Sequence, residues 1–166
     1  MAVNPTCHAT SLAESPAMPI RLKKFSPCWS LLLAMLPVLP ALGADIVVMV
    51  QGLESAQGAL GCALFSSANS TRFPLDQSQA ITLRASAQQG SLQCVFREVP
   101  AGTYAVAAAH DINGNFKTDR NLMGLPTEPW AVSNNVRPTL RAPRFDEAAF
   151  TVTADQTKQI ELRLAR

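Results

Sequence analysis

The sequence predicts an all-β fold, a single β-sandwich of seven short antiparallel strands interrupted by one long crossover loop. Two observations support this class. Apolar and polar residues alternate with a period of two in several short stretches after residue 44, which is the pattern of half-buried strands. None of these stretches sustains the period of an amphipathic helix. We therefore expect one domain over residues 45–166, preceded by a targeting segment.

Residues 18–44 have the anatomy of a secretory signal peptide, with a basic start, an apolar run and small residues at the end. The apolar run is about 14 residues long and a spanning helix needs roughly 20, so we expect no permanent membrane anchor. Cleavage is expected near Gly43 or Ala44. Residues 1–17 precede the basic start and are interpreted as an over-long start or an extended leader.

Removal of this leader leaves a neutral domain. The chain has 14 Lys and Arg against 12 Asp and Glu; three of the former and one of the latter precede residue 45, which leaves 11 of each. A neutral domain gives no reason to expect a nucleic-acid partner. We expect a periplasmic or secreted protein whose partner is an unknown protein or carbohydrate at the cell envelope.

The first four expected strands each place their apolar residues on one face. These residues are Ile46, Val48 and Val50; Leu60, Cys62 and Leu64; Ile81 and Leu83; and Leu92, Cys94 and Phe96. Cys62 and Cys94 therefore both point inward, and in an oxidising compartment a disulfide between them is the favoured interpretation. Two buried free thiols are the alternative.

Three further strands complete the expected sandwich. Residues 103–109 are apolar on both faces, which is typical of a central, covered strand. The chain then ends in a predicted hairpin, in which Phe150 and Val152 face Ile160, Leu162 and Leu164 across a turn at 154–157. Seven such strands favour an immunoglobulin-like sandwich of two antiparallel sheets. The crossover loop, residues 110–147, is too long and too apolar to be an ordinary connection.

The most informative stretch of that loop begins at Asp111 and sets side-chain oxygens at alternate positions. Positions 1, 3, 5 and 9 of the calcium-loop pattern are taken by Asp111, Asn113, Asn115 and Asp119, and the Lys117 carbonyl takes position 7. Phe116 stands where the pattern has Gly, and Leu122 where it has a bidentate Glu. We weigh a weak structural calcium site against turns in which these side chains bond their own backbone.

Other candidates in the loop are weaker. Trp130 beside Glu128 could stack on a sugar or peptide, although a Trp in a long loop more often fixes that loop to the sheet. His110 is the third candidate for ligand binding. His110, Asp111, Glu128 and Ser133 also supply the residue types of a hydrolase, but adjacent strand residues point to opposite faces, so Asp111 would not orient His110.

Five segments occur in an order that resembles an uncharacterised bacterial family, domain of unknown function 2141. They are residues 100–106 (PAGTYAV), 110–115 (HDINGN), 124–128 (GLPTE), 133–135 (SNN) and 143–146 (PRFD). The resemblance implies an exported single-domain sandwich of transthyretin-like or carboxypeptidase-regulatory-like type, with no established activity. This chain departs from the family pattern at Phe116, Pro129 and Val132, where Gly, Gly and an aromatic residue are usual.

The sequence thus predicts an exported, non-catalytic β-sandwich module that acts in binding or structure at the cell envelope, with its long loop stabilised by calcium or by turns. A carrier of a small ligand or carbohydrate that uses Trp130 is the alternative, and a hydrolase comes third.

Overall fold

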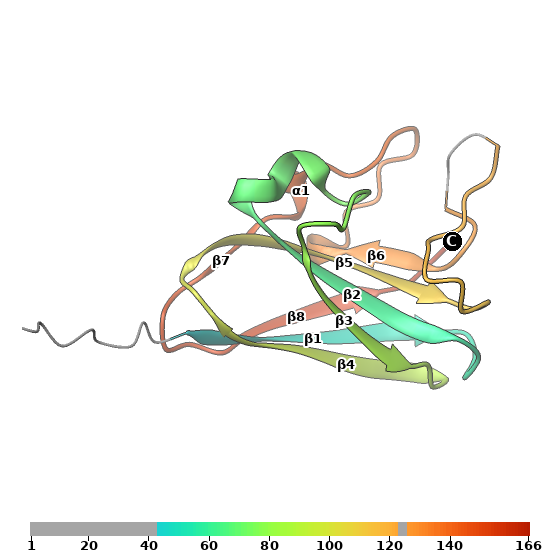
Figure 1. Ribbon diagram of the computed structural model, residues 1–166, viewed down its shortest axis with the longest axis horizontal. Coiled ribbons are helices and arrows are strands. Elements are labelled where there is room, and N and C mark those ends of the chain that lie inside the picture. Colours follow the sequence, from blue (N-terminus) through green and yellow to red (C-terminus); the bar gives the residue numbers. More distant parts are fainter. Residues whose placement is uncertain (1–42, 123–125) are drawn as a thin grey trace, which may run out of the picture. The chain divides into compact units, whose positions relative to one another are not determined.

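The computed structural model describes residues 43–122 and 126–166, which form two facing β-sheets (Figure 1). The strands are β1 (Ala44–Leu53), β2 (Ala59–Ser66), β3 (Ile81–Ser86), β4 (Gly90–Val99), β5 (Gly102–Asp111), β6 (Trp130–Val132), β7 (Phe150–Val152) and β8 (Lys158–Arg163). The short helices are η1 (Ser67–Arg72), η2 (Ser133–Asn135) and α1 (Phe145–Ala148). The all-β prediction is therefore confirmed at the level of two packed sheets.

The predicted leader falls almost entirely outside the described residues, which begin at Gly43, and its cleavage stays a prediction. β1 begins at Ala44, within one residue of the expected start of the domain. Within the described ranges, no helix has the length and apolar character needed to cross a membrane.

The smaller sheet has the strand order β4-β1-β8. β1 pairs with β4 in the antiparallel sense, but it pairs with β8 in the parallel sense, with Val48 opposite Ile160. The prediction of a purely antiparallel sandwich is therefore wrong. Alternation along a strand reports which face is buried, and it carries no information on the direction of the neighbouring strand.

The larger sheet has the order β3-β2-β5-β6, and β7 also pairs with β5. β6 pairs with residues 107–109 of β5 and β7 pairs with residues 102–104, so the two short strands share one edge of β5. The described residues thus contain eight strands where seven were predicted. The additional strand, β6, is only three residues long and lies inside the expected crossover loop.

The predicted C-terminal hairpin is wrong, because its two strands belong to different sheets. Val152 lies opposite Gly102 of β5 in the larger sheet, whereas Leu162 lies opposite Val50 of β1 in the smaller one. Both strands bury their apolar faces, as expected, since Val152 and Leu162 are buried. Residues between them carry the chain from one sheet to the other, which a sequence pattern cannot distinguish from a tight turn.

The core between the sheets consists of the predicted inward residues. Ile46, Val48, Val50 and Leu60 are fully buried, as is Val106 on the central strand β5. Ile81 departs from the prediction with 55% of its surface exposed, because β3 is an edge strand. Each fully buried aliphatic side chain contributes roughly 1.5 to 3 kcal/mol relative to leaving it in water.

Cys62 and Cys94 form a disulfide, which confirms the favoured interpretation of this pair. The bond joins β2 of the larger sheet to β4 of the smaller one, and both residues are buried in the core.

At the start of β5, the Tyr104 hydroxyl donates to the Pro100 carbonyl at 3.0 Å. This bond fixes the turn between β4 and β5.

The crossover loop is ordered by three short elements rather than by one motif. β5 continues through His110 to Asp111, so the loop begins two residues later than predicted, and β6, η2 and α1 follow within it. β6 adds to the edge of β5 through Ala109 and Trp130. Trp130 also exchanges two backbone hydrogen bonds with Ala165, which ties the loop to the residues after β8.

Candidate functional site

The outer face of the larger sheet, which is turned away from the smaller sheet, has a covered half and an open half. Phe65, Phe73 and Phe145 fill the covered half, with edge-to-face ring pairs at centroid distances of 5.2 and 6.0 Å. η1 and α1 lie over this half (Figure 1). The open half forms a cleft, the candidate functional site.

One row of residues crosses four strands beneath this cleft. Gly61 on β2 lies opposite Arg84 on β3 and opposite Ala109 on β5. Ala109 in turn lies opposite Trp130 on β6. Neighbouring strands are about 4.8 Å apart, so the row spans about 14 Å from the backbone of Arg84 to that of Trp130. The row has large side chains at its ends and almost none in its middle, which leaves the floor open.

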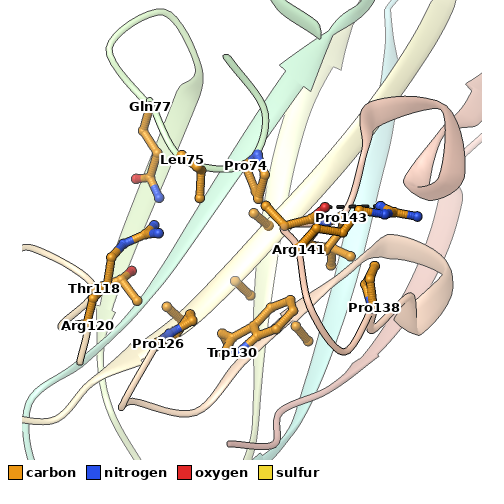
Figure 2. A pocket seen from close by; sticks show the side chains of 16 residues that line it. Pro74, Leu75, Gln77, Thr118, Arg120, Pro126, Trp130, Pro138, Arg141 and Pro143 are labelled. Carbon is orange, nitrogen blue, oxygen red and sulfur yellow. Dashed lines mark hydrogen bonds between the residues drawn. The ribbon is translucent and has the colours of Figure 1, made fainter. Parts of the chain in front are cut away.

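The cleft has an apolar part of about 100 Å³ and a polar part of about 430 Å³. In Figure 2, Thr118 and Arg120 stand on one side of the apolar part and Arg141 and Pro143 on the other, with Trp130 between them. Six residues line both parts: Pro74, Leu75, Gln77, Ala109, Thr118 and Arg120. The two parts therefore adjoin each other along these residues.

Trp130 is fixed at the apolar end of the cleft. The Arg137 guanidinium lies over its ring at 4.4 Å from the centroid and donates to the Trp130 carbonyl at 2.6 Å. Arg137 also donates to the Ala165 carbonyl at 3.0 Å, and burial lowers the pKa of its guanidinium. Trp130 is thus both anchored to the sheet and part of the cleft wall. Its predicted role in ligand binding stays a prediction.

An ion pair closes the far wall of the apolar part. Arg141 donates to the two carboxylate oxygens of Glu147 at 2.5 and 2.9 Å. These bonds, followed by the backbone N–H of Arg144, lower the pKa of Glu147 to about 2. Because the pKa of Glu147 is lowered, the stabilisation that the ion pair provides is fully present above the ordinary pKa of Glu. It is lost as the pH falls toward 2 and the carboxylate is protonated. The wall therefore persists at mildly acidic pH.

Asp111, at the end of β5, organises the polar part of the cleft. Its Oδ1 accepts the N–H groups of Gly114 at 2.8 Å and Asn115 at 3.1 Å, and its Oδ2 accepts that of Phe116 at 2.8 Å. Arg84 donates to the same Oδ2 at 2.6 Å. The Asp111 side chain is only 5% exposed. One carboxylate thus holds a whole turn of the loop and an arginine from β3.

The other predicted calcium ligands also come together, through hydrogen bonds among themselves. The side-chain oxygen of Asn113 accepts the Asn115 N–H, and that of Asn115 accepts the Lys117 N–H. The amide groups of both asparagines donate to Asp119, at 2.6 and 2.8 Å. These are the bonds of the alternative interpretation, in which Asx turns stabilise the loop. Among the described residues, no three His, Cys, Asp or Glu side chains gather to hold a metal ion.

Calcium binding by residues 111–119 stays a prediction with a direct test. If the loop binds calcium at the weak end expected for two carboxylates, Kd on the order of 10⁻³ M, then 10 mM calcium should stabilise the fold by about 1.4 kcal/mol. Thermal melts in calcium and in chelator measure this. A rise in midpoint that Asp119→Ala removes would confirm the site; identical midpoints would establish the loop as a turn held by its own hydrogen bonds.

Comparison with known families decides the relationship that the sequence motifs suggested. A family model described as "Uncharacterized protein conserved in bacteria", DUF2141, matches residues 48–161. The chain belongs to the DUF2141 family. No curated protein and no solved structure matches it. The matched range runs from β1 into β8 and includes every residue that lines the cleft.

Within the DUF2141 domain, the SNN segment has a structural role that the sequence did not reveal. Ser133 lies between β6 and β7 along the edge of β5, where its hydroxyl accepts the Val106 N–H at 3.0 Å and donates to the Ala148 carbonyl at 2.5 Å. Asn135 reaches β8, where it accepts the Arg163 N–H and donates to the Glu161 carbonyl. The segment therefore joins the crossover to both sheets.

Glu128 and His110, the other predicted ligand-binding residues of the DUF2141 domain, do not line the cleft. Glu128 is buried, and its two oxygens accept the N–H groups of Ile112 at 2.9 Å and Asp119 at 3.1 Å. It holds the base of the loop. His110 is fully buried on the inner face of β5, with Nε2 at 2.8 Å from the Gln57 carbonyl and no partner for Nδ1 in the described structure.

The residue types that raised the hydrolase alternative are not assembled into one site. The Ser133 hydroxyl bonds only to main-chain groups, and the ring of His110 bonds to the main chain of Gln57. Asp111 binds Arg84 on the outer face, as the expected strand alternation implies. No hydrogen bond in the described part of the DUF2141 domain therefore links a nucleophile to a base.

Sequence reasoning missed the two residues that define the polar cleft, Gly61 and Arg84. A glycine inside a strand marks a bulge or a place where another molecule approaches closely, and Gly61 carried this signal. A Cβ added at Gly61 would meet no atom nearer than the Ala109 carbonyl oxygen at 3.9 Å. Packing within the DUF2141 domain therefore does not require glycine at this position.

Proposed function

We propose that this DUF2141 protein is an exported, non-catalytic binding module that holds a small ligand in the cleft on the outer face of the larger sheet. The observation that carries the proposal is the row from Arg84 through Gly61 and Ala109 to Trp130, which leaves a hollow in a face that is otherwise covered. Ligand sites are concave, mostly apolar and supplied with a few polar groups.

Export is supported by two independent features. The segment 18–44 has the composition of a signal peptide. The Cys62–Cys94 disulfide favours an oxidising compartment, because reducing systems keep such bonds open in the cytosol. A non-catalytic role agrees with the commitment of Asp111 and Glu128 to hydrogen bonds that hold the loop.

The cleft favours a small-ligand carrier over a flat surface for a protein partner. A carbohydrate is the second candidate, because Trp130 lines the apolar part and aromatic rings provide faces on which sugars pack. A sugar also needs several hydrogen-bonding groups near the ring. The apolar part is lined mainly by Pro, Ala and Leu residues around Trp130, so an apolar group fits it better than a sugar does.

The test fills the floor of the cleft. Gly61→Val places a β-branched side chain on a strand, in open space, so the fold should be kept while the hollow is blocked. The probe is 4-phenylbutan-1-ol, compared with glucose, and the reporter is Trp130 fluorescence. Trp130 is the only tryptophan in the full chain once Trp29→Phe is introduced.

We expect saturable quenching or a spectral shift with the phenyl alcohol, at least tenfold weaker binding in Gly61→Val, and little response to glucose. The matched control is Gln93→Val, an exposed strand position on β4 of the smaller sheet, which should bind as wild type. Binding that survives Gly61→Val, or no binding of either probe, would contradict a ligand site in this cleft. A response to glucose alone would favour the carbohydrate carrier.

A further inference from the structure

We propose that the ligand carries one negatively charged group, a carboxylate or a phosphate, at the Arg84 end of the cleft and an apolar body at the Trp130 end. This inference rests on the proposed function, since it names the chemical class of the ligand for the same cleft. Three features of the cleft support it: the arrangement of Arg84, the charged residues of the polar part, and the walls that the two parts share.

Arg84 is held in one position by two contacts on different sides. Its guanidinium donates to Asp111 Oδ2 at 2.6 and 3.3 Å, and it lies over the Phe116 ring at 4.3 Å from the centroid. A guanidinium has five N–H donors, and a single oxygen is the acceptor of Arg84 in the described structure. The remaining donors are therefore available to a second anion, and the side chain is 33% exposed.

Phe116 supports this arrangement at a conformational cost. Its φ of 67° lies in the left-handed region that disfavours residues other than Gly, and 76% of its surface is exposed. Burial therefore does not offset the strain. Strained backbone positions persist where the surrounding structure requires them, and they are concentrated at ligand sites. The contact that the strained position provides is the one with Arg84, which also lines the polar part of the cleft.

The charge balance of the cleft favours an anion. Four basic residues line its two parts, Arg84, Lys117, Arg120 and Arg141, and Arg141 is paired with Glu147 in the far wall. Asp111 is the single acidic residue among the lining residues, and its two oxygens already accept three N–H groups and Arg84. Lys117 lines the polar part without an ion pair among the described residues. A carboxylate here would meet the remaining donors of Arg84 and the positive charge of Lys117.

The apolar part determines the rest of the ligand. It adjoins the polar part through shared walls at Leu75, Thr118 and Arg120, so a ligand anchored near Arg84 extends toward Trp130. Its volume of about 100 Å³ suits a ring or a short branched group rather than a long chain. The anion and the apolar group are therefore separated by a short linker.

The test compares probes that share one body and differ only in charge. These are 4-phenylbutyrate, 4-phenylbutan-1-ol, 4-phenylbutylammonium and 4-phenylbutyl phosphate, titrated into the full chain carrying Trp29→Phe with Trp130 fluorescence as the readout. We expect the better of the two anions to bind at least tenfold more tightly than the alcohol, and the ammonium to bind more weakly than the alcohol. Which anion is tighter identifies the headgroup. The preference should fall with added salt, because exposed charges are screened.

Lys117→Glu should reduce the preference for the anions over the alcohol by about tenfold. Its matched control, Lys158→Glu on β8, makes the same charge change on the smaller sheet and should leave the preference intact. Gly61→Val should weaken all the probes together. Equal affinity for the anions and the alcohol, or a preference unchanged in Lys117→Glu, would overturn the inference while leaving the cleft as a ligand site. Failure of every probe to bind would overturn both proposals.

Discussion

Replacing Cys62 and Cys94 together by alanine should lower the free energy of unfolding by about 3 to 4 kcal/mol. The two residues are separated by 32 positions. A crosslink across a loop of this length lowers the conformational entropy of the unfolded chain, which stabilises the fold by about 3 to 4 kcal/mol. The effect should be large because the bond joins β2 and β4, which belong to different sheets. Alanine is preferred to serine, since a hydroxyl buried without a partner would add its own cost.

Urea unfolding of the oxidised protein, the reduced protein and the double alanine variant measures this effect. The reduced wild type and the variant should have similar midpoints, because both lack the crosslink and keep the sheets. A difference of less than about 1 kcal/mol between the oxidised and reduced forms would contradict a disulfide that stabilises the sandwich.

Asp111→Ala is expected to have the second largest effect, a loss of about 2 to 3 kcal/mol. The substitution removes the acceptor of three backbone N–H groups and the partner of Arg84. Removing one member of a fully buried ion pair costs about 3 to 5 kcal/mol. The smaller figure applies here because the Arg84 side chain is 33% exposed and can turn to water.

Hydrogen exchange provides a local measurement of the same change. The amides of Gly114, Asn115 and Phe116 should lose protection in Asp111→Ala, while the core amides of β5 exchange only as much faster as the overall stability falls. Asp119→Ala is the matched control. Its carboxylate accepts hydrogen bonds from the Asn113 and Asn115 side chains, so we expect a loss below about 1 kcal/mol. Equal losses in the two variants would contradict the central role of Asp111.

The inward faces of the strands could be predicted from the sequence because burial imposes a period of two. Val48, Leu60 and Cys94 all lie in the core, and the pairing of Cys62 with Cys94 followed from the shared phase of their strands. The neighbours of each strand could not be predicted. Val152 and Leu162 satisfy the same alternation whether their strands form a hairpin or enter separate sheets.

The candidate site was only partly accessible to sequence reasoning. The spacing of Asp111, Asn113 and Asn115 identified a loop with side-chain oxygens turned to its own interior, and these residues do come together. The cleft beside it depends on residues from four strands that are distant in the sequence. Gly61 and Arg84 become neighbours only through the register of β2 and β3, which no local pattern specifies.

The parallel pairing of β1 with β8 determines when the fold can be completed. β1 is the first strand in the described part of the chain and β8 the last, so the smaller sheet lacks one edge until residues 158–163 have been synthesised. Contacts between segments so far apart form slowly, because the intervening chain must be ordered first. During synthesis the nascent chain therefore stays without a closed core. For the exported module proposed above, this order of completion would keep the chain unfolded until its last strand has crossed the membrane.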